Sequence, residues 1–410
     1  MRKTLLLIGS SLNCGAPGKI SEQIGILAQK KGWVVYQAHG LRHSNPSKLN
    51  TIPLVTPFEE KIQALYSFLF DRHGLGPESK TKELVNWIKK NNPEIIHLHN
   101  IHGHFLNYKV LFDYLRETEI PVVWTLHDFW PITGHCVHFD HIGCELWKTH
   151  CEKCSLNNTY PKTILFRRTF QNFSIKRDCF TSLKNMTIVP VSNWEGSLLK
   201  ESFLAKYQIK TIYNGVDTNV FKYRESSLRK SLDLIDKKIL LGVASPWSER
   251  KGYSDYIKLR VQLPDNYIII MVGVTNKEIK NLPNGIIGIE RTQNQIELAE
   301  YYSMADIVLN LSSQETFGMT TVEAMACGTP VIVYNKTASP ELVTKETGKI
   351  VTAGMIDELL VAIHEIIDKG TFFYQESCRQ RALLYFDKDK CFAEYINLYN
   401  DLLKKQLSHF

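Results

Sequence analysis

The chain has 410 residues, 44% of them hydrophobic, and a formal net charge of +7 at pH 7. This length predicts two or three domains, and the apolar content is ample for buried cores. The strongest candidate for a membrane span, Ile268–Val274, has only the length of a strand, far below the roughly 18 residues that a span needs. We therefore do not expect a membrane-spanning protein. A net charge of this size suits nucleotide, anionic lipid or nucleic acid as partner and excludes none of them.

The first residues, MRKTLLLIGSSLNCGA, have the outline of a secretory leader. Their apolar core, Leu5–Ile8, is too short for one, and Asn13 before Cys14 is a poor cleavage residue. We expect a first strand here and a cytoplasmic protein. In that compartment the nine cysteines would be free thiols or metal ligands rather than disulfides.

Short apolar runs alternate with amphipathic segments along the whole chain, which predicts an α/β protein with parallel sheets. The strands expected in the first half are Thr4–Ile8, Trp33–Ala38, Glu94–Leu98, Pro121–Leu126 and Thr187–Val191. A second series consists of Lys238–Val243, Tyr267–Val272, Ile286–Ile289, Asp306–Leu311, Pro330–Val333 and Lys349–Val351. Two doubly wound, Rossmann-like domains follow from the two series.

The boundary between these domains is expected at the segment YNGVDTNVFKY, Tyr213–Tyr223, because Asn-Gly is typical of a connecting turn. We predict an N-terminal domain at 1–213, a C-terminal domain at 214–386 and a final helix at 387–410. The helical spacing of Cys391, Tyr395, Leu398 and Leu402 supports that helix.

Two segments of the N-terminal domain are candidates for ligand contact. The turn Gly9–Gly18 precedes a helix expected to start near Lys19, and its amides could approach a phosphate, although such loops are often only packing devices. His127, in WTLHDFW, follows a strand and so lies at the edge where ligands bind in these folds. Three further histidines, interpreted as acceptor-pocket or packing residues, are His97, His99 and His102.

An insertion at 134–154 contains Cys136, Cys144, Cys151 and Cys154. Four thiolates suit tetrahedral zinc, and a long irregular loop needs some fixing element. Free structural thiols are the alternative, since only one CxxC pair is present, and His138 and His141 are alternative ligands. Such a zinc would be structural, because four thiolates leave no open coordination position.

The segment Tyr160–Lys184 is basic and rich in phenylalanine, with Arg167, Arg168, Lys176 and Arg177 among its cations. It could bind an anionic membrane surface. Alternatively, its phenylalanines face the protein core. Single-stranded nucleic acid is a third option for such a composition, but no nucleic-acid-binding module supports it.

Two motifs of the C-terminal domain predict a site for a nucleotide-sugar. In WSERKG, Arg250 and Lys251 follow a strand and could meet the negative charge of a leaving diphosphate. In SSQETFGMTTVEAMACGTP, residues Phe317, Gly318, Met319 and Thr320 are expected at a helix N-terminus, where free amides favour an anion. Glu315 could then bind sugar hydroxyls and Glu323 a ribose diol. The alternative is that both acids only complement the helix dipole.

This last stretch resembles the E-x7-E signature of retaining glycosyltransferases of family four with the GT-B fold, including the continuation EAMACGTPVI. The resemblance covers almost the whole chain in order. It implies that Lys251 contacts the diphosphate, that Gly15 approaches the donor, and that His127, within a T-x-H segment, lies beside the donor sugar. One departure is Ser245, where the family usually has an arginine, so Arg250 is the candidate replacement.

We therefore expect two facing Rossmann-like domains and retaining transfer of a hexose from a nucleoside-diphosphate-sugar to a growing, lipid-linked glycan. Cysteine insertions of this kind resemble those of colanic-acid and exopolysaccharide enzymes. Catalysis would need no cofactor, and the protein would act at the inner face of the cytoplasmic membrane, without nucleic acid. The alternatives are a non-catalytic nucleotide-sugar or membrane adaptor and a GT-B-fold nucleotide-sugar epimerase.

Overall fold

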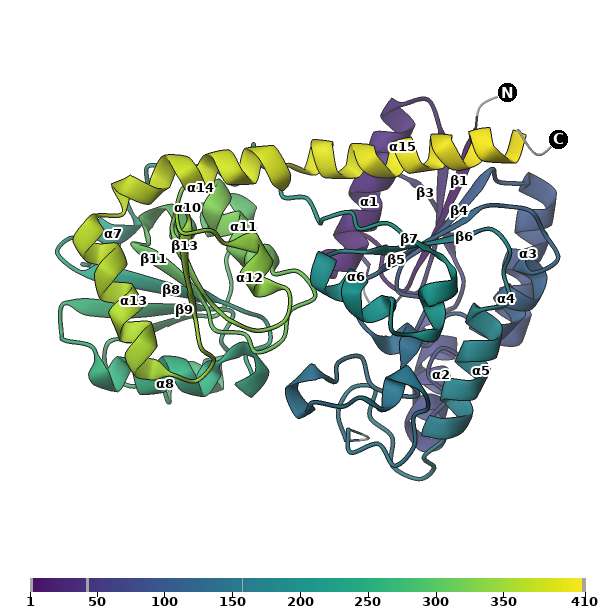
Figure 1. Cartoon of the computed structure of the whole chain (residues 1–410), viewed down its shortest axis with the longest axis horizontal. Helices are drawn as coiled ribbons and strands as arrows, with labels where there is room; N and C mark the ends of the chain where they lie inside the picture. The colour runs from purple at the N-terminus through teal and green to yellow at the C-terminus, as the bar shows by residue number, and fades with distance from the viewer. Residues whose placement is uncertain (1–2, 42–43, 157, 408–410) are drawn as a thin grey trace. The chain divides into compact units, whose positions relative to one another are not determined.

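A computed structural model describes residues 3–41, 44–156 and 158–407. The chain forms two compact units, one from Met1–Ile212 together with Phe392–Phe410 and the other from Tyr213–Cys391 (Figure 1). The boundaries predicted from the sequence, after residues 213 and 386, differ from these by one and five residues. Each unit is an α/β domain built on one parallel sheet.

The sheet of the first unit has the order β3-β2-β1-β4-β5-β6-β7 in the described residues, and its neighbouring strands pair in parallel. Helices α3, α4 and α5 lie together on one face, with α1 on the other (Figure 1). The strands are β1 (Thr4–Gly9), β2 (Val34–His39), β3 (Asn50–Pro53), β4 (Ile95–Leu98), β5 (Val122–Leu126), β6 (Met186–Pro190) and β7 (Gln208–Ile209). The helices are α1 (Gly15–Lys30), α2 (Pro57–Phe70), α3 (Glu78–Asn91), α4 (Tyr108–Leu115), α5 (Thr169–Phe180) and α6 (Asn193–Leu199), with short 3-10 turns at Trp130–Ile132, Asp140–Ile142, Leu146–Lys148 and Phe203–Lys206.

The five strands predicted for this half are confirmed to within one residue at either end. Strands β3 and β7 were missed, because β3 is a largely exposed edge strand without an apolar pattern and β7 has two residues. The helix predicted to start near Lys19 begins at Gly15 instead. Gly15 has a φ of +62°, so glycine is suited to this first position.

The sheet of the second unit has the order β10-β9-β8-β11-β12-β13, again with parallel pairs. The six strands predicted there are all confirmed. They are β8 (Lys238–Val243), β9 (Tyr267–Val272), β10 (Ile286–Ile289), β11 (Ile307–Asn310), β12 (Val331–Tyr334) and β13 (Gly348–Val351). The helices are α7 (Leu228–Ser231), α8 (Tyr253–Gln262), α9 (Asn276–Ile279), α10 (Gln295–Met304), α11 (Met319–Ala326), α12 (Ser339–Leu342), α13 (Ile356–Lys369) and α14 (Phe372–Tyr385), with a 3-10 turn η5 at Glu249–Lys251.

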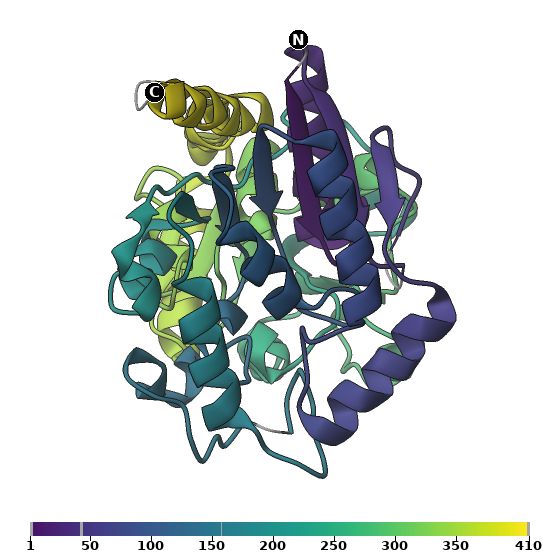
Figure 2. The same ribbon diagram turned by 90° about the vertical axis from the view of Figure 1, so that its right-hand side faces the viewer.

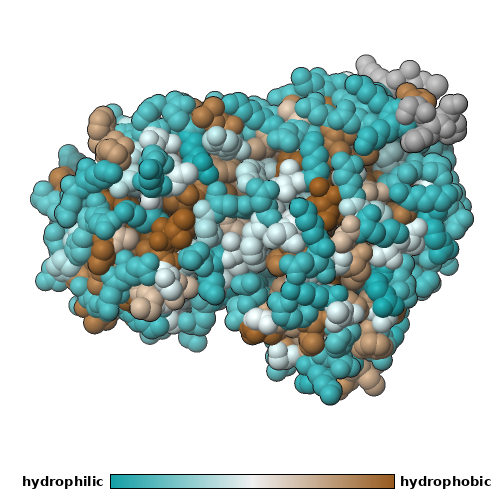
Figure 3. Space-filling view, in the orientation of Figure 1, coloured by the Kyte–Doolittle hydropathy of each residue, from teal (hydrophilic) through white to brown (hydrophobic). Residues whose placement is uncertain are grey.

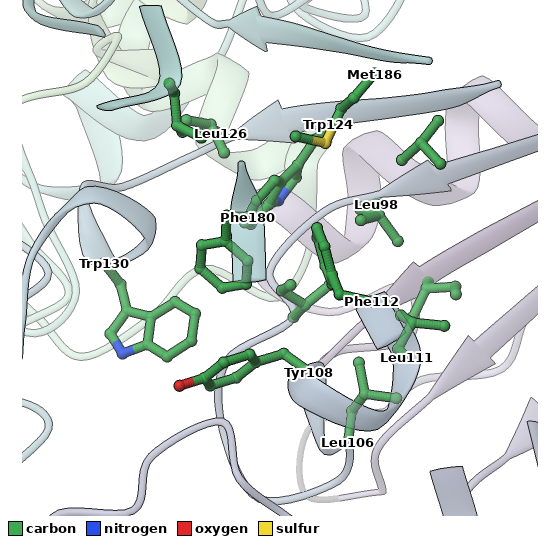
Figure 4. Close-up of a cluster of buried hydrophobic side chains, with 14 of the residues drawn as sticks. Leu98, Leu106, Tyr108, Leu111, Phe112, Trp124, Leu126, Trp130, Phe180 and Met186 are labelled. Atoms are coloured by element: carbon green, nitrogen blue, oxygen red, sulfur yellow. The ribbon is translucent and has the colours of Figure 1, made fainter. Parts of the chain in front are cut away.

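An aromatic core joins the sheet of the first unit to its covering helices (Figure 4). The ring of Phe180 on α5 lies 4.8 Å from that of Trp124 on β5 and 4.9 Å from that of Phe112 on α4, measured between centroids. All three side chains are buried. Burial of such a side chain contributes roughly 1.5–3 kcal/mol. This packing holds the end of β5, where His127 and Asp128 follow.

The last helix, α15 (Lys388–Leu407), belongs to the first unit from Phe392 onward. Its Tyr399 hydroxyl lies 2.6 Å from His97 Nδ1 on β4, and its Tyr395 hydroxyl accepts a hydrogen bond from Thr125. Burial lowers the pKa of His97 to about 3, so this histidine is neutral. The helix is thus held to the sheet by a hydrogen-bonded polar cluster as well as by apolar packing.

In the described part of the chain, none of the helices combines the length and the apolar character needed to cross a bilayer.

Candidate active site

Two loops of the second unit meet at the carboxyl edge of its sheet. One follows β8 and contains η5, and the other follows β11, the neighbouring strand. The Lys251 Nζ lies 2.5 Å from Glu315 Oε1, and the two side chains are 22% and 15% exposed. The structure therefore brings together the cation and the carboxylate that the sequence assigned to the leaving group and to the sugar. A partly buried, paired and still accessible lysine can exchange its carboxylate partner for an anionic ligand.

Arg250 joins the same two loops through main-chain contacts. Its carbonyl oxygen accepts a hydrogen bond from the Ser313 amide, and its Nη1 donates to the Gln314 carbonyl oxygen over 3.2 Å. Next to it, Gly252 has a φ of +76°, and a Cβ there would lie 2.4 Å from the Leu311 carbonyl oxygen. A glycine is therefore required where the two loops pack. The guanidinium of Arg250 braces this packing, and its replacement of the family arginine stays a prediction.

The helix predicted after the glycine turn is α11, and it begins at Met319 with Gly318 as its N-cap. Gly318 has a φ of +110°, and among the described residues no side chain caps the helix. The first amides, at Met319 and Thr320, can therefore meet an anion. Phe317 is only 2% exposed and packs against Tyr213 and Phe386, so only its main chain can face a ligand.

Glu323 lies one turn into α11 and is positioned by Tyr302. The Tyr302 hydroxyl donates to Glu323 Oε2 over 2.9 Å. Burial raises the pKa of this tyrosine well above its usual value, and the nearby Glu323 charge raises it further. The hydroxyl therefore stays protonated and remains a donor. The carboxylate is thereby held in one orientation, as a site for a diol requires.

Gln314 is a residue that the sequence analysis missed. Its side chain is fully buried beside Glu315, and neither polar atom has a hydrogen-bond partner among the described residues. Buried amides are normally paired, so this one marks the loop as incomplete without a further polar group. A glutamine next to a glutamate in a loop looks like surface in the sequence, and only burial sets it apart.

In the first unit, His127 follows β5 and Gly15 opens α1. His127 Nε2 lies 3.1 Å from His99 Nδ1, with the two rings stacked. Burial lowers the pKa of His127 to about 4, so it is neutral and able both to donate and to accept. Around Gly15 a Cβ would meet only Pro17, at 4.0 Å, so this turn is open to a close approach.

A second polar chain runs beside His127 and extends the predicted histidine group. Asp128 Oδ2 lies 2.8 Å from His102 Nε2, and His102 Nδ1 lies 3.1 Å from His73 Nε2. His73, after α2, carried no signal in the sequence. Burial raises the pKa of Asp128, but its interaction and hydrogen bond with His102 and the hydrogen bond from the Trp130 amide outweigh burial and hold the pKa below its usual value. The consistent arrangement therefore has His73 donating to His102, and His102 donating to the Asp128 carboxylate.

The four cysteines of the insertion line one cavity of about 60 Å³, together with His135. A hydrogen bond from Cys136 lowers the pKa of Cys154 below its usual value, and the same bond raises that of Cys136. The alternative ligands His138 and His141 do not line this cavity. Over the described ranges, no group of three or more histidine, cysteine or acidic side chains is arranged as a finished metal site.

Comparisons with known proteins agree with this architecture. The family model for glycosyl transferases group 1 matches residues 225–382, and that for glycosyltransferase family 4 matches residues 56–220. The chain is 24% identical over 328 residues to a putative colanic acid biosynthesis glycosyl transferase, WcaC, of Escherichia coli K12, covering 76% of this chain and 77% of the relative. It is also 24% identical over 406 residues to N-acetyl-alpha-D-glucosaminyl L-malate synthase of Bacillus anthracis, covering 95% of each chain.

Among solved structures, sucrose-phosphate synthase of Thermosynechococcus elongatus superposes with a TM-score of 0.70 at 17% identity, covering 98% of this chain and all of that one. HepE of Anabaena, solved in complex with UDP-glucose, superposes with a TM-score of 0.65 at 18% identity, covering 99% and 100%. The protein is therefore a glycosyltransferase with the GT-B fold. More particularly, the chain belongs to the family-four glycosyltransferases, whose two family models match its two halves.

Replacing Lys251 with alanine should lower the rate of sugar transfer by about 10²–10³-fold, because one fixed partner of developing charge is lost. Folding should survive, since the side chain is partly exposed. Turnover and a melting curve measured together test this. Lys258→Ala, which removes an exposed lysine of α8, is the matched control. A Lys251 variant with normal turnover would exclude the role.

Replacing Glu315 with glutamine should leave binding of a nucleoside diphosphate unchanged and weaken binding of the matching nucleotide-sugar, because the proposed partner of Glu315 is the sugar. Titration calorimetry with both ligands measures the two effects separately. Glu290→Gln, at an exposed position after β10, is the control. Equal weakening of both ligands would contradict the assignment.

Proposed function

We propose that this protein transfers a hexose, with retention of the anomeric configuration, from a nucleoside-diphosphate-sugar to a growing glycan in polysaccharide biosynthesis. The observation that carries the proposal is the Lys251–Glu315 pair next to the open N-terminus of α11. Support comes from HepE, solved with UDP and with UDP-glucose, and from relatives named for colanic acid biosynthesis and for O-antigen chain mannosyl transfer.

The proposed reaction breaks the bond between the anomeric carbon and the diphosphate oxygen and forms a bond from that carbon to the acceptor oxygen. Retention requires the acceptor to approach the face that the diphosphate leaves, and its proton passes to the departing phosphate. Lys251 and the α11 amides would stabilise the growing negative charge. Glu315 and the Gln314 amide would hold the sugar hydroxyls, and Glu323 the ribose. These groups supply the charge that the step needs, so we propose that no cofactor takes part.

For the acceptor we propose a lipid-linked glycan, bound by the first unit. Neutral His127 and the chain Asp128–His102–His73 offer both donors and acceptors to sugar hydroxyls. His127 would also approach the donor sugar and Gly15 its phosphates, as the family resemblance implies. We further propose that any zinc bound by the cysteine insertion is structural.

Product stereochemistry tests the proposed function. Incubation with a panel of α-linked nucleotide-sugars and a lipid-linked glycan should yield an α-linked product, read from the anomeric proton signal by NMR. A β-linked product would overturn retention. Binding of the nucleotide-sugar with neither transfer nor hydrolysis would support an adaptor protein instead, and release of an epimerised sugar nucleotide would support an epimerase.

We also propose that the protein binds the inner face of the cytoplasmic membrane through a surface of the first unit. An apolar stripe on α2 points outward, formed by Phe58, Ile62, Leu65 and Tyr66 at helical spacing. Phe58 is 71% exposed. Figure 2 shows α2 (purple) at the outer edge of this unit. A helix normally packs its apolar stripe against the protein core, so we interpret this exposed stripe as a binding surface.

A neighbouring loop extends the stripe into a patch. The Ile164 and Phe166 amides donate to the carbonyl oxygens of Phe68 and Leu69 on α2, and the ring of Phe166 stacks on that of Phe70 at 5.5 Å. Ile164, Leu165 and Phe166 are exposed. On the face seen in Figure 3, apolar side chains (brown) reach the surface at the lower end of this unit. We call the exposed residues of α2 and this loop the apolar patch.

The charges around the apolar patch favour an anionic lipid surface over a protein partner. Lys61, Arg72, Lys162 and Arg167 are exposed there. The sequence prediction needs correction in one respect: Lys176, Phe173 and Phe180 on α5 are buried and contribute to the interior. They lie on the inner face of α5, whereas Arg177 on the same helix is exposed.

The double substitution Phe58→Ser and Leu65→Ser should release the protein from vesicles containing anionic lipid, because apolar insertion is lost, while nucleotide-sugar binding is retained. Sedimentation with vesicles measures it. Raising the salt concentration should also weaken binding of the unaltered protein, since each cation near the surface contributes on the order of 1 kcal/mol and salt screens it.

The matched control is the pair Val261→Ser and Phe372→Ser, two more exposed apolar side chains on the second unit. This control should sediment like the unaltered protein. If both double variants sediment alike, the membrane proposal is wrong. If the unaltered protein forms dimers that the patch variant does not, the patch is instead an interface between copies.

A further inference from the structure

The cysteine insertion poses a structural problem that thiols alone do not solve. Among the described residues from Thr133 to Arg168, the only regular elements are two 3-10 turns, at Asp140–Ile142 and Leu146–Lys148. A loop of this length in an ordered domain needs a fixing element. Cys136 and Cys151 are buried, Cys144 and Cys154 are half-buried, and all four line the same cavity. Two polar groups around this cavity indicate what fixes the insertion.

The first such group is Lys176 on α5, which is only 2% exposed. Its Nζ donates to the carbonyl oxygens of Trp130 and Thr133 and lies 3.5 Å from the ring centroid of Trp130. Within the described residues no carboxylate stands at ion-pair distance from it, and burial lowers its pKa to about 7, while the charges of Asp71, Cys136 and Cys151 act in the opposite direction. A buried cation without a carboxylate partner is costly unless other negative charge lies nearby. Deprotonated cysteines would supply that charge.

The second group is His135, fully buried against Asp71. Its Nδ1 lies 2.8 Å from Asp71 Oδ1, and the two side chains are 0% and 2% exposed. Its Nε2 has no hydrogen-bond partner among the described residues, and the side chain lines the cysteine cavity. Asp71 also accepts from the Arg168 amide, which ties the end of the insertion to the end of α2. A polar atom buried without a partner at this point indicates that the cavity is completed by another species.

We propose that the cavity binds one zinc ion through Cys136, Cys144, Cys151 and Cys154, with Lys176 as the buried counter-charge of the zinc-thiolate centre. Zinc displaces four thiol protons and draws the sulfurs into a tetrahedron with a net charge of minus two. The ammonium of Lys176 offsets part of this charge. His135 is a fifth donor at the cavity, but a buried cation favours an anionic thiolate over a neutral imidazole in the fourth position. The proposal leaves sugar transfer without a metal, as proposed above.

Metal analysis of the purified full-length protein tests the centre without any activity measurement. We expect about one zinc per chain, retained in Cys179→Ser, which removes a half-buried cysteine outside the cavity, and lost in Cys151→Ser. Replacement of zinc by Co²⁺ should give the absorption spectrum of four thiolates. A stoichiometry near zero would overturn the proposal. A three-thiolate spectrum that depends on His135 would overturn the ligand set.

The role of Lys176 has its own test. Lys176→Met should weaken zinc affinity about 10- to 100-fold, the range found when a group outside the ligand shell is removed, with the Co²⁺ spectrum unchanged. Lys176→Arg should restore the affinity, and Lys148→Met, on the exposed side of the insertion, should not alter it. Chelator competition measures these constants. Unaltered affinity in Lys176→Met would overturn the counter-charge role. Nucleotide-sugar binding by the same proteins shows whether the second unit is intact, so failure here is distinct from failure of the proposed function.

Discussion

The ion pair between Lys251 and Glu315 is the interaction on which the proposed donor site depends. The two residues are 64 apart in the sequence, and they meet because β8 and β11 are neighbours in a parallel sheet whose loops leave from one edge. Gly252 and the main-chain bonds of Arg250 hold both loops in place. In the free protein the carboxylate keeps the lysine positioned. Under the proposed function, a diphosphate bound beside the α11 amides would replace the carboxylate as the partner of this lysine.

The first unit relies on a different constraint, which is the burial of many polar groups behind an aromatic core. His97, His99 and His127 have lowered pKa values because burial disfavours their charged forms, so they act as neutral hydrogen-bonding groups. Ionised Asp128 directs the neighbouring imidazoles into one donor and acceptor pattern. Under the proposed function, these polar groups would bind sugar hydroxyls, which both donate and accept. Rigid aromatic packing around these groups keeps them in place for their hydrogen bonds. This matters because partly satisfied polar networks are costly.

The insertion and the apolar patch share one anchor in Asp71. This residue ends α2, accepts from the Arg168 amide and pairs with His135. The segment that carries Ile164–Phe166 runs between that anchor and the cysteine cavity, and it bonds to the last turn of α2. An element that fixes the insertion therefore also fixes the loop half of the patch. The proposed zinc would therefore stabilise the apolar patch as well as the cysteine insertion.

The sequence by itself predicted the two parallel sheets, eleven of the thirteen strands that the structure describes and the candidate donor residues, because apolar runs, glycine turns and the E-x7-E stretch are local patterns. It did not determine which buried groups face one another. Lys176 looked like a surface cation, the stripe on α2 went unnoticed, and Gln314 and His73 carried no signal, because burial depends on elements distant in the chain. Only the tertiary structure decided these points, because packing determines what surrounds each side chain. It buries Lys176 beside the cysteine cavity and leaves the apolar stripe of α2 exposed.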